Sequence, residues 1–211
     1  MFDTTITDEL LSTTRAVRKR LDLDRPVDPQ VILDCIALAQ QAPTGTNAQG
    51  WRWVVVTEPT TKAALAEFYR SGCLAYVQKA VVEEEDPQTR RVYESTLQLA
   101  LTIERVPVLV IPCIERRLEG ASLVGTASGF GSILPAAWSF LLALRSRGLG
   151  SVWTTAHLWN EAAAAELLGI PDTVTQVAMF PVAHTIGAEF KRAVRPPPES
   201  ITFFERWGTT R

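Results

Sequence analysis

The chain has few of the residues on which catalysis by protein side chains usually depends. Its two histidines, His157 and His184, lie far apart without metal-ligand spacing, so no histidine-based zinc site is expected. The hydrolase turn G-x-S-x-G and the phosphate loop G-x-x-x-x-G-K-[ST] are absent. The segment G-F-G at 129–131 begins like a dinucleotide fingerprint but lacks its third glycine. These absences favour a bound cofactor as the carrier of any chemistry.

Excess charge, paired cysteines and a membrane-spanning run are missing as well. Lysine and arginine number 21 against 23 acidic residues, a net charge of −2, so neither nucleic acid nor an anionic membrane is an expected partner. The three cysteines, Cys35, Cys73 and Cys113, are scattered and odd in number, which favours free thiols. The longest apolar run, near Ile133–Leu144, is too short to cross a bilayer, and the first residues do not form a signal segment. We expect a cytoplasmic protein.

The apolar pattern that is present predicts one α+β domain, since 46% of the residues are hydrophobic and no tract is of low complexity. Helices are expected over residues 8–21, 28–42, 58–69, 86–104, 135–147 and 160–169. Strands are expected over residues 53–57, 106–114, 151–155 and 175–182. Residues 72–86 are predicted as a mobile loop or irregular helix, and residues 119–128 as a loop.

Three segments carry candidate binding residues. The loop Ala42–Trp53 gathers backbone amides, hydroxyls and side-chain amides that suit a polar planar ligand, although an ordinary helix-to-strand turn has a similar composition. Arg15 and Arg18 are three residues apart in the first predicted helix and would share one face, where they form either a phosphate site or a solvated basic surface. The tail from residue 191 contains three prolines and then the apolar stretch Ile201–Trp207, which suggests docking on a partner subunit.

In this order the segments resemble the nitroreductase family of FMN-dependent oxidoreductases. The resemblance rests on T-R-A-V-R at 14–18, A-P-T-G-T-N-A-Q-G-W at 42–51 and G-L-G-S-V-W-T-T at 148–155, followed by the basic, proline-rich tail. It implies a nitroreductase-like α+β fold with a central mixed, mostly antiparallel sheet flanked by helices. It also implies an intertwined homodimer in which the tail, residues 191–211, wraps the partner. Family members commonly carry R-R-S-x-R and A-P-S-x-x-N-x-Q-P-W, so Thr14, Ala16, Thr44 and Gly50 depart from the pattern.

The resemblance also implies roles for individual positions around FMN. Arg15, Ala16, Arg18 and, from the tail, Arg195 would approach the ribityl phosphate. Pro43, Thr44, Gly45 and Asn47 of the other subunit would contact the ring and ribityl chain. Thr154 and Thr155 would face the ring edge, and Ser132 would lie near the ring at the start of the apolar helix. No catalytic side chain and no metal ligand is predicted.

The activity implied is reduction of a small-molecule acceptor, such as a nitroaromatic or a quinone, with NADH or NADPH as electron donor. One pocket used twice gives a ping-pong mechanism. Reductive dehalogenation or flavin breakdown on the same fold is one alternative, and a flavin-sequestering protein without turnover is another. A helical interaction domain that binds no flavin is a further alternative, and a colourless purified protein would identify it.

Overall fold

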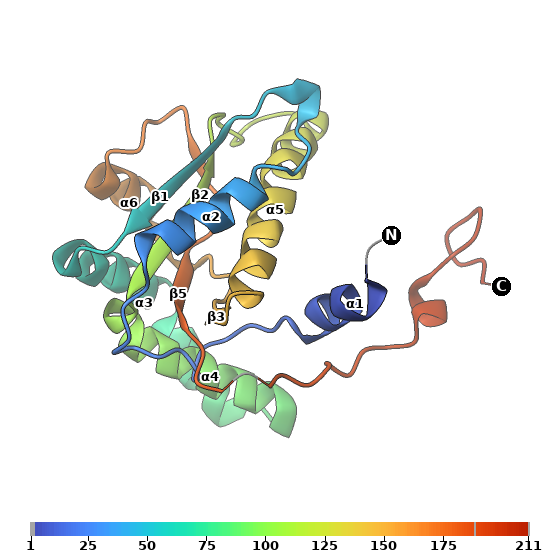
Figure 1. The fold of residues 1–211 in the computed structure, drawn as a ribbon, viewed down its shortest axis with the longest axis horizontal. Coiled ribbons are helices and arrows are strands. Elements are labelled where there is room, and N and C mark those ends of the chain that lie inside the picture. The colour runs from blue at the N-terminus through green and yellow to red at the C-terminus, as the bar shows by residue number, and fades with distance from the viewer. Residues whose placement is uncertain (1–2, 188, 211) are drawn as a thin grey trace. The chain divides into compact units, whose positions relative to one another are not determined.

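The computed structural model describes residues 3–187 and 189–210, which form two compact units. The larger unit comprises residues 15–188, and the smaller combines residues 1–14 with residues 189–211. Figure 1 shows the course of the chain. Each unit is described by itself.

The larger unit is built around an antiparallel sheet with the strand order β1-β2-β5-β3, in which β4 also pairs with β2. The strands span Trp51–Val56 (β1), Val108–Ile114 (β2), Leu149–Gly150 (β3), Thr175–Gln176 (β4) and Phe180–His184 (β5). Every residue of β2 is buried, which identifies it as the central strand. This arrangement confirms the predicted α+β class and its largely antiparallel sheet.

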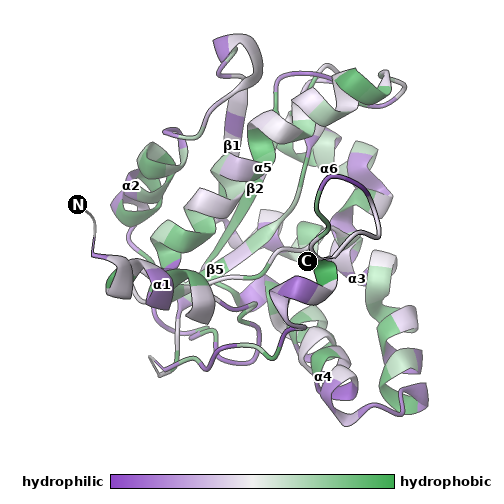
Figure 2. Ribbon diagram, turned by 90° about the vertical axis from the view of Figure 1, so that its right-hand side faces the viewer, coloured by the Kyte–Doolittle hydropathy of each residue, from purple (hydrophilic) through white to green (hydrophobic). Residues whose placement is uncertain are grey.

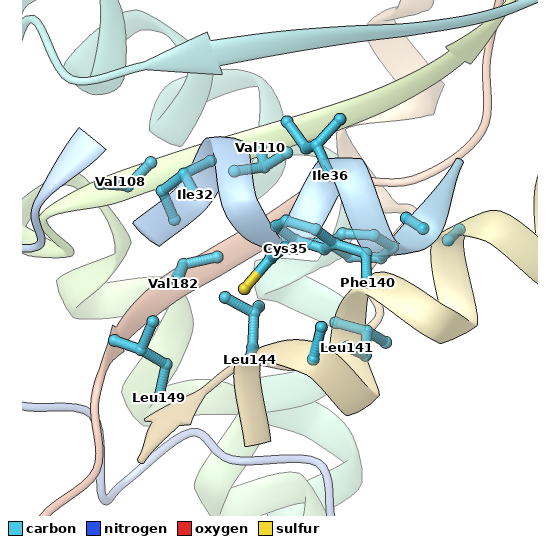
Figure 3. Packing of buried hydrophobic residues seen from close by; sticks show 14 of the residues in the cluster. Ile32, Cys35, Ile36, Val108, Val110, Phe140, Leu141, Leu144, Leu149 and Val182 are labelled. Atoms are coloured by element: carbon cyan, nitrogen blue, oxygen red, sulfur yellow. The ribbon is translucent and has the colours of Figure 1, made fainter. Parts of the chain in front are cut away.

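Two helices, α2 (Pro29–Ala39) and α5 (Leu123–Arg145), cover one face of the sheet. Asp28 caps α2 by accepting a hydrogen bond from the backbone N–H of Gln30, and a proline occupies the first turn, as the sequence predicted. Their apolar faces meet in a cluster with β2 and β5, where Figure 3 shows Cys35 of α2 directed toward Leu144 of α5. Each large side chain in such a cluster stabilises the fold by about 1.5–3 kcal/mol.

The helices α3 (Pro59–Glu83), α4 (Pro87–Thr102) and α6 (Glu161–Leu168) lie on the other side of the sheet (Figure 2). A short 3-10 helix, η3 (Ala156–Asn160), packs on α3, and η2 (Ile103–Arg105) links α4 to β2. Cys35 and Cys113 are buried free thiols, and Cys73 is a partly buried one, so the expectation of free cysteines is confirmed.

A bulge divides the predicted continuous strand 175–182 into two strands, β4 and β5, which both pair with β2. Between the pairs Val110↔Phe180 and Cys113↔Gln176, β2 advances three residues while its partner segment advances four. Pro112 lies at this point and has no N–H to donate, so it contributes only its carbonyl, to the Val177 N–H. The predicted strand 151–155 is also wrong: the ladder ends at Gly150, and only a bridge between Thr154 and Met179 follows.

The smaller unit contains helix α1 (Thr4–Thr13) and the 3-10 helix η4 (Pro198–Ile201). The predicted helix 8–21 is wrong at both ends. Asp3 caps α1, and the hydroxyls of Thr13 and Thr14 bond back to the carbonyls of Glu9 and Leu10, a pattern that weakens a helix. Residues 15–17 have no regular secondary structure, and the Val17 N–H donates to the Ser151 carbonyl at 2.8 Å instead of to a carbonyl of its own segment.

Of the two segments expected to be irregular, residues 72–86 prove helical as far as Glu83, which is the helical one of the two alternatives predicted, and the predicted loop 119–128 is helical from Leu123. Helix α3 continues to Glu83, and Gly72 does not end it but lies where the helix packs closely against η3. Helix α5 begins at Leu123 with Ser122 as its cap, so Pro135 lies inside it and not at its start. The G-F-G segment is part of the same helix.

By length and composition α5 is long and apolar enough to cross a membrane. It is the one helix of this kind within residues 3–187 and 189–210, and half of its most apolar stretch is buried inside the molecule. The core helix of a globular protein meets the same two criteria, and its packing on the sheet accounts for its composition.

Candidate functional site

The loop that follows α2 is fixed to the middle of α5. The Gly45 N–H donates to the Ser132 hydroxyl at 3.0 Å, and that hydroxyl donates to the Ser128 carbonyl at 2.8 Å. A Cβ atom on Gly45 would lie 2.8 Å from the Ser128 hydroxyl oxygen, so only glycine allows this approach without a shift. Ser132 is therefore buried in mid-helix, where it holds the loop in position, and not at the helix start as predicted.

Three residues without glycine's freedom adopt left-handed backbone conformations in this loop. They are Thr46 (φ 53°), Asn47 (φ 55°) and Gln49 (φ 50°), all exposed. Such conformations cost on the order of 1–3 kcal/mol each, and strained residues of this kind cluster at functional sites. The Asn47 side chain accepts a hydrogen bond from the Gln49 amide at 2.9 Å, and its own amide N–H₂ donates to no other residue that the structure describes. The strained loop displays polar groups on the surface without burying them.

Arg15, Ala16 and Arg18 lie on a segment without regular secondary structure that enters a turn at Arg18, not on a helix face. Arg15 and Arg18 are partly buried and Ala16 is exposed, while the buried Val17 packs on β3. A Cβ on Gly150 would lie 3.0 Å from Val17, which shows how closely this segment follows the strand. Arg15 has no hydrogen bond or ion pair to any other residue that the structure describes.

Arg18 is a half-buried cation without an acidic partner in the described part of the chain. Its Nη1 atom donates a long hydrogen bond, 3.5 Å, to the Ser95 hydroxyl of α4. Partial burial lowers the pKa of the Arg18 guanidinium from its usual value, and the adjacent Tyr69 works against that shift. Burial is also the main cause that raises the pKa of Tyr69, so the phenol stays protonated and does not neutralise the arginine. An anion at this position would restore the interactions that Arg18 loses on leaving water.

Thr154 and Thr155 differ in environment although they are adjacent. The buried Thr154 hydroxyl donates to the Met179 carbonyl at 2.6 Å, and the Thr154 carbonyl accepts from the Met179 N–H. Thr155 is exposed and precedes η3. Of the two hydroxyls, only that of Thr155 is free of a hydrogen bond to another described residue.

The structure brings the loop and Ser132 together but does not bring them to the arginines. The loop contacts α5 at Ser128 and Ser132, whereas Val17 packs at β3, which follows the far end of α5 (Figure 1). From Ser132 to Arg145 the helix axis advances about 20 Å. Within one chain the loop lies beside the first half of this helix, and the arginine segment lies beyond its C-terminal end.

Arg195 belongs to the smaller unit, where it is exposed and its guanidinium donates to the Val194 carbonyl at 3.3 Å. Its role stays a prediction. Sequence reasoning missed Ser95 and Tyr69, which surround Arg18, because no local motif marks either residue. No group of three or more potential metal ligands occurs among residues 3–187 and 189–210.

The model of the Nitroreductase family matches residues 11–184. The chain belongs to the nitroreductase family. Its fold is similar to that of nitroreductase A from Vibrio parahaemolyticus, with a TM-score of 0.72 at 17% identity over 100% of this chain and 79% of the other. It is also similar to oxidised iodotyrosine deiodinase bound to FMN and 3-iodo-L-tyrosine, with a TM-score of 0.70 at 20% identity over 96% of this chain and 98% of the other.

A curated relative is the iodotyrosine deiodinase of Drosophila melanogaster, which is 28% identical over 181 residues. The alignment covers 83% of this nitroreductase-family chain and 61% of the relative, so the chain spans about three fifths of that protein's length. The resemblance inferred from the motifs is therefore confirmed at the level of family and fold.

Proposed function

We propose that this protein is an FMN-dependent oxidoreductase. When bound, FMN would accept a hydride from NADH or NADPH and then reduce an acceptor such as a nitroaromatic or quinone, one substrate replacing the other in the same pocket. Family membership supports this proposal, as does the FMN bound to a structural relative. The observation that carries it is Arg18, a half-buried cation without an acidic partner in the described part of the chain.

The chain's own residues would bind and orient the cofactor. Arg15 and Arg18 would hold the phosphate through charge-assisted hydrogen bonds, each contributing about 1.5–3 kcal/mol. The loop residues Pro43, Thr44, Gly45 and Asn47 would contact the ring and ribityl chain from a second copy of the chain. Ser132 would act through the loop that it holds, and Thr155 offers a hydroxyl for the ring edge.

Arg18→Ala tests the phosphate assignment. The affinity for FMN should fall tenfold or more, since a loss of ~1.4 kcal/mol is a factor of ten. Arg91→Ala is the matched control, because Arg91 is exposed on α4 and donates only to the Pro87 carbonyl of its own helix. Fluorescence titration of the apoprotein measures both variants. An unchanged affinity of Arg18→Ala would remove Arg18 from the site.

Reductive dehalogenation is a second candidate, favoured by the 28% identity to an iodotyrosine deiodinase. Purified protein would be reduced anaerobically and mixed with 3-iodo-L-tyrosine or with a nitroaromatic. Iodide release without turnover of the nitroaromatic would favour the dehalogenase, and consumption of NAD(P)H with the nitroaromatic would favour the first proposal. FMN binding with no turnover of either substrate would favour a flavin-sequestering protein.

A further inference from the structure

A cavity of about 630 Å³ lies outside all of the positions assigned to FMN. It is formed where the segment leading into α2 meets the chain after α5 and the β3–β5 pair, and its walls include Val27, Val31, Leu149 and His184. This volume is within the range of about 300–1,000 Å³ that is usual for small-molecule sites. None of the eleven positions predicted to contact FMN lines the cavity.

Two arginines give the cavity a positive charge. Arg25 and Arg147 both line it, and neither forms an ion pair with another residue in the described ranges. The Arg147 guanidinium donates to the Ala143 carbonyl at 3.1 Å and to the Ser146 hydroxyl at 3.2 Å. These contacts fix its position at the end of α5 without neutralising it.

The acidic residues nearby are committed to backbone groups. The Asp28 carboxylate lines the cavity but accepts from the Gln30 N–H at 2.9 Å as the cap of α2. The Asp22 carboxylate accepts from the N–H groups of Asp24 and Arg25, both at 3.2 Å. Neither carboxylate pairs with a guanidinium group of the cavity, so these groups keep donors available for an anion, and the two arginines with Asp28 leave the lining a net charge of +1.

The remaining walls are apolar or neutral. Val27 and Leu149 are buried members of the core cluster, so they present hydrocarbon to the cavity. His184 is hydrogen-bonded to the backbone of Pro26, and burial, followed by the charge of Arg25, lowers its pKa. The imidazole is thus neutral at pH 7 and adds no third cation.

We propose that this cavity binds a small organic carboxylate with a compact apolar body. A guanidinium group matches the planar carboxylate with two parallel hydrogen bonds, and Arg25 and Arg147 can each supply this fork. The apolar body would cover the partly buried Val31, which a small inorganic anion would leave in contact with water. The site goes beyond the proposed oxidoreductase activity and does not depend on it.

Benzoate is the probe, and the two histidines of the chain give the readout. In the protein as purified, the histidine ring signals of the NMR spectrum should separate into those of His184, which lines the cavity, and those of His157, which is 0% exposed elsewhere in the fold. Benzoate should move the His184 signals saturably and leave those of His157 in place. Benzamide, which has the same shape without the charge, should bind at least tenfold more weakly.

Arg25→Gln and Arg147→Gln should each weaken benzoate binding by on the order of tenfold, while the exposed control Arg91→Gln should not. Equal affinity for benzamide in the unaltered protein would overturn the proposal. His184 signals that benzoate does not move would also overturn the proposal. This result would be seen if benzoate bound only beside the flavin, where it would change the flavin absorption bands, or if a second copy of the chain filled the cavity. Inorganic phosphate that binds as tightly as benzoate would show a general anion site and would contradict the carboxylate assignment.

Discussion

The buried imidazole of His157 is the least compensated polar side chain in the described part of the fold. It is 0% exposed, and neither ring nitrogen has a hydrogen-bond partner among the residues described. Burial lowers its pKa from 6.5 to about 4, with the Glu161 carboxylate opposing the shift. His157 is therefore neutral in the folded protein at any pH where the unfolded chain would begin to protonate it.

This difference makes the free energy of unfolding depend on pH. Between pH 6.5 and about pH 4 the unfolded chain binds a proton at His157 that the folded protein does not, so stability falls as the pH falls through this window. The full shift corresponds to on the order of 3 kcal/mol. Urea denaturation of the protein and of His157→Leu at several pH values should show that, as the pH falls through this window, the unaltered protein loses on the order of 3 kcal/mol more of its free energy of unfolding than His157→Leu does.

The matched control is His184→Leu. His184 is only partly buried, and its pKa is lowered by this partial burial and by the charge of Arg25. Its curve should keep most of the pH dependence of the unaltered protein. Parallel curves for the unaltered protein and His157→Leu would contradict the assignment to His157.

Asn47 allows the ligand role of the loop to be separated from its conformation. Because φ is 55° at this position, Asn47→Ala adds backbone strain of roughly 1 kcal/mol, whereas Asn47→Gly removes the amide without strain. If the amide contacts FMN, both variants should weaken FMN binding or change the flavin reduction potential. Only Asn47→Ala should lower the melting temperature of the apoprotein.

A different set of results would contradict a ligand role for Asn47. In that case Asn47→Gly would bind FMN with normal affinity and potential, and the effects of Asn47→Ala would follow stability alone. Thermal melts of the apo and FMN-loaded forms, run beside a potential measurement, distinguish the two patterns.

At the scale of elements, local signals were predictable and long-range ones were not. Asp28-Pro29 and Asp86-Pro87 predicted the starts of α2 and α4, because a cap and a proline act within one turn. The segment 15–20 has a helical charge pattern, but Val17 pairs with Ser151, more than a hundred residues away. No local sequence pattern predicts this hydrogen bond, and such a tertiary contact outweighs the helix propensity of the segment.

In the candidate site, too, the local features were predictable from the sequence and the long-range contacts were not. The loop at 42–53 was recognisable from its composition, and the nitroreductase family from its motifs. The attachment of Gly45 to Ser132 joins positions 87 residues apart, and the Arg18–Ser95 contact joins positions 77 apart. Such contacts depend on how helices pack on the sheet, which the sequence alone does not specify.

Gly72 shows how one residue determines the packing of an element. A Cβ there would lie 2.1 Å from the Ala156 carbonyl oxygen and 2.9 Å from a ring carbon of Trp159. Gly72→Ala should therefore lower the melting temperature, although alanine favours a helix by about 1 kcal/mol over glycine. Gln78→Ala, at an exposed position of the same helix, should leave it nearly unchanged. A raised melting temperature for Gly72→Ala would contradict the close approach of α3 to η3.

At the scale of the whole molecule, the separation along α5 bears on assembly. The loop at Gly45 contacts the first half of this helix and the arginine segment lies beyond its C-terminal end, with about 20 Å of helix axis between Ser132 and Arg145. A single chain that binds FMN through both groups would have to span this distance. Two copies with crossed α5 helices would instead place the loop of one beside the arginines of the other, as the family resemblance predicts.

The exposed face of α5 provides the surface for such a pairing. Leu134 and Trp138 are 36% and 45% exposed and lie four residues apart, so they share one face, on which a Cβ at Gly131 would meet open space. We predict a homodimer with an interface of roughly 2,000–5,000 Å². Trp138→Glu should shift the protein toward monomer in light scattering and release FMN in parallel, because each site would lose the partner's loop. Leu167→Glu, at a comparably exposed position on α6, should change neither property. A monomer that retains FMN at micromolar concentration would overturn the shared site.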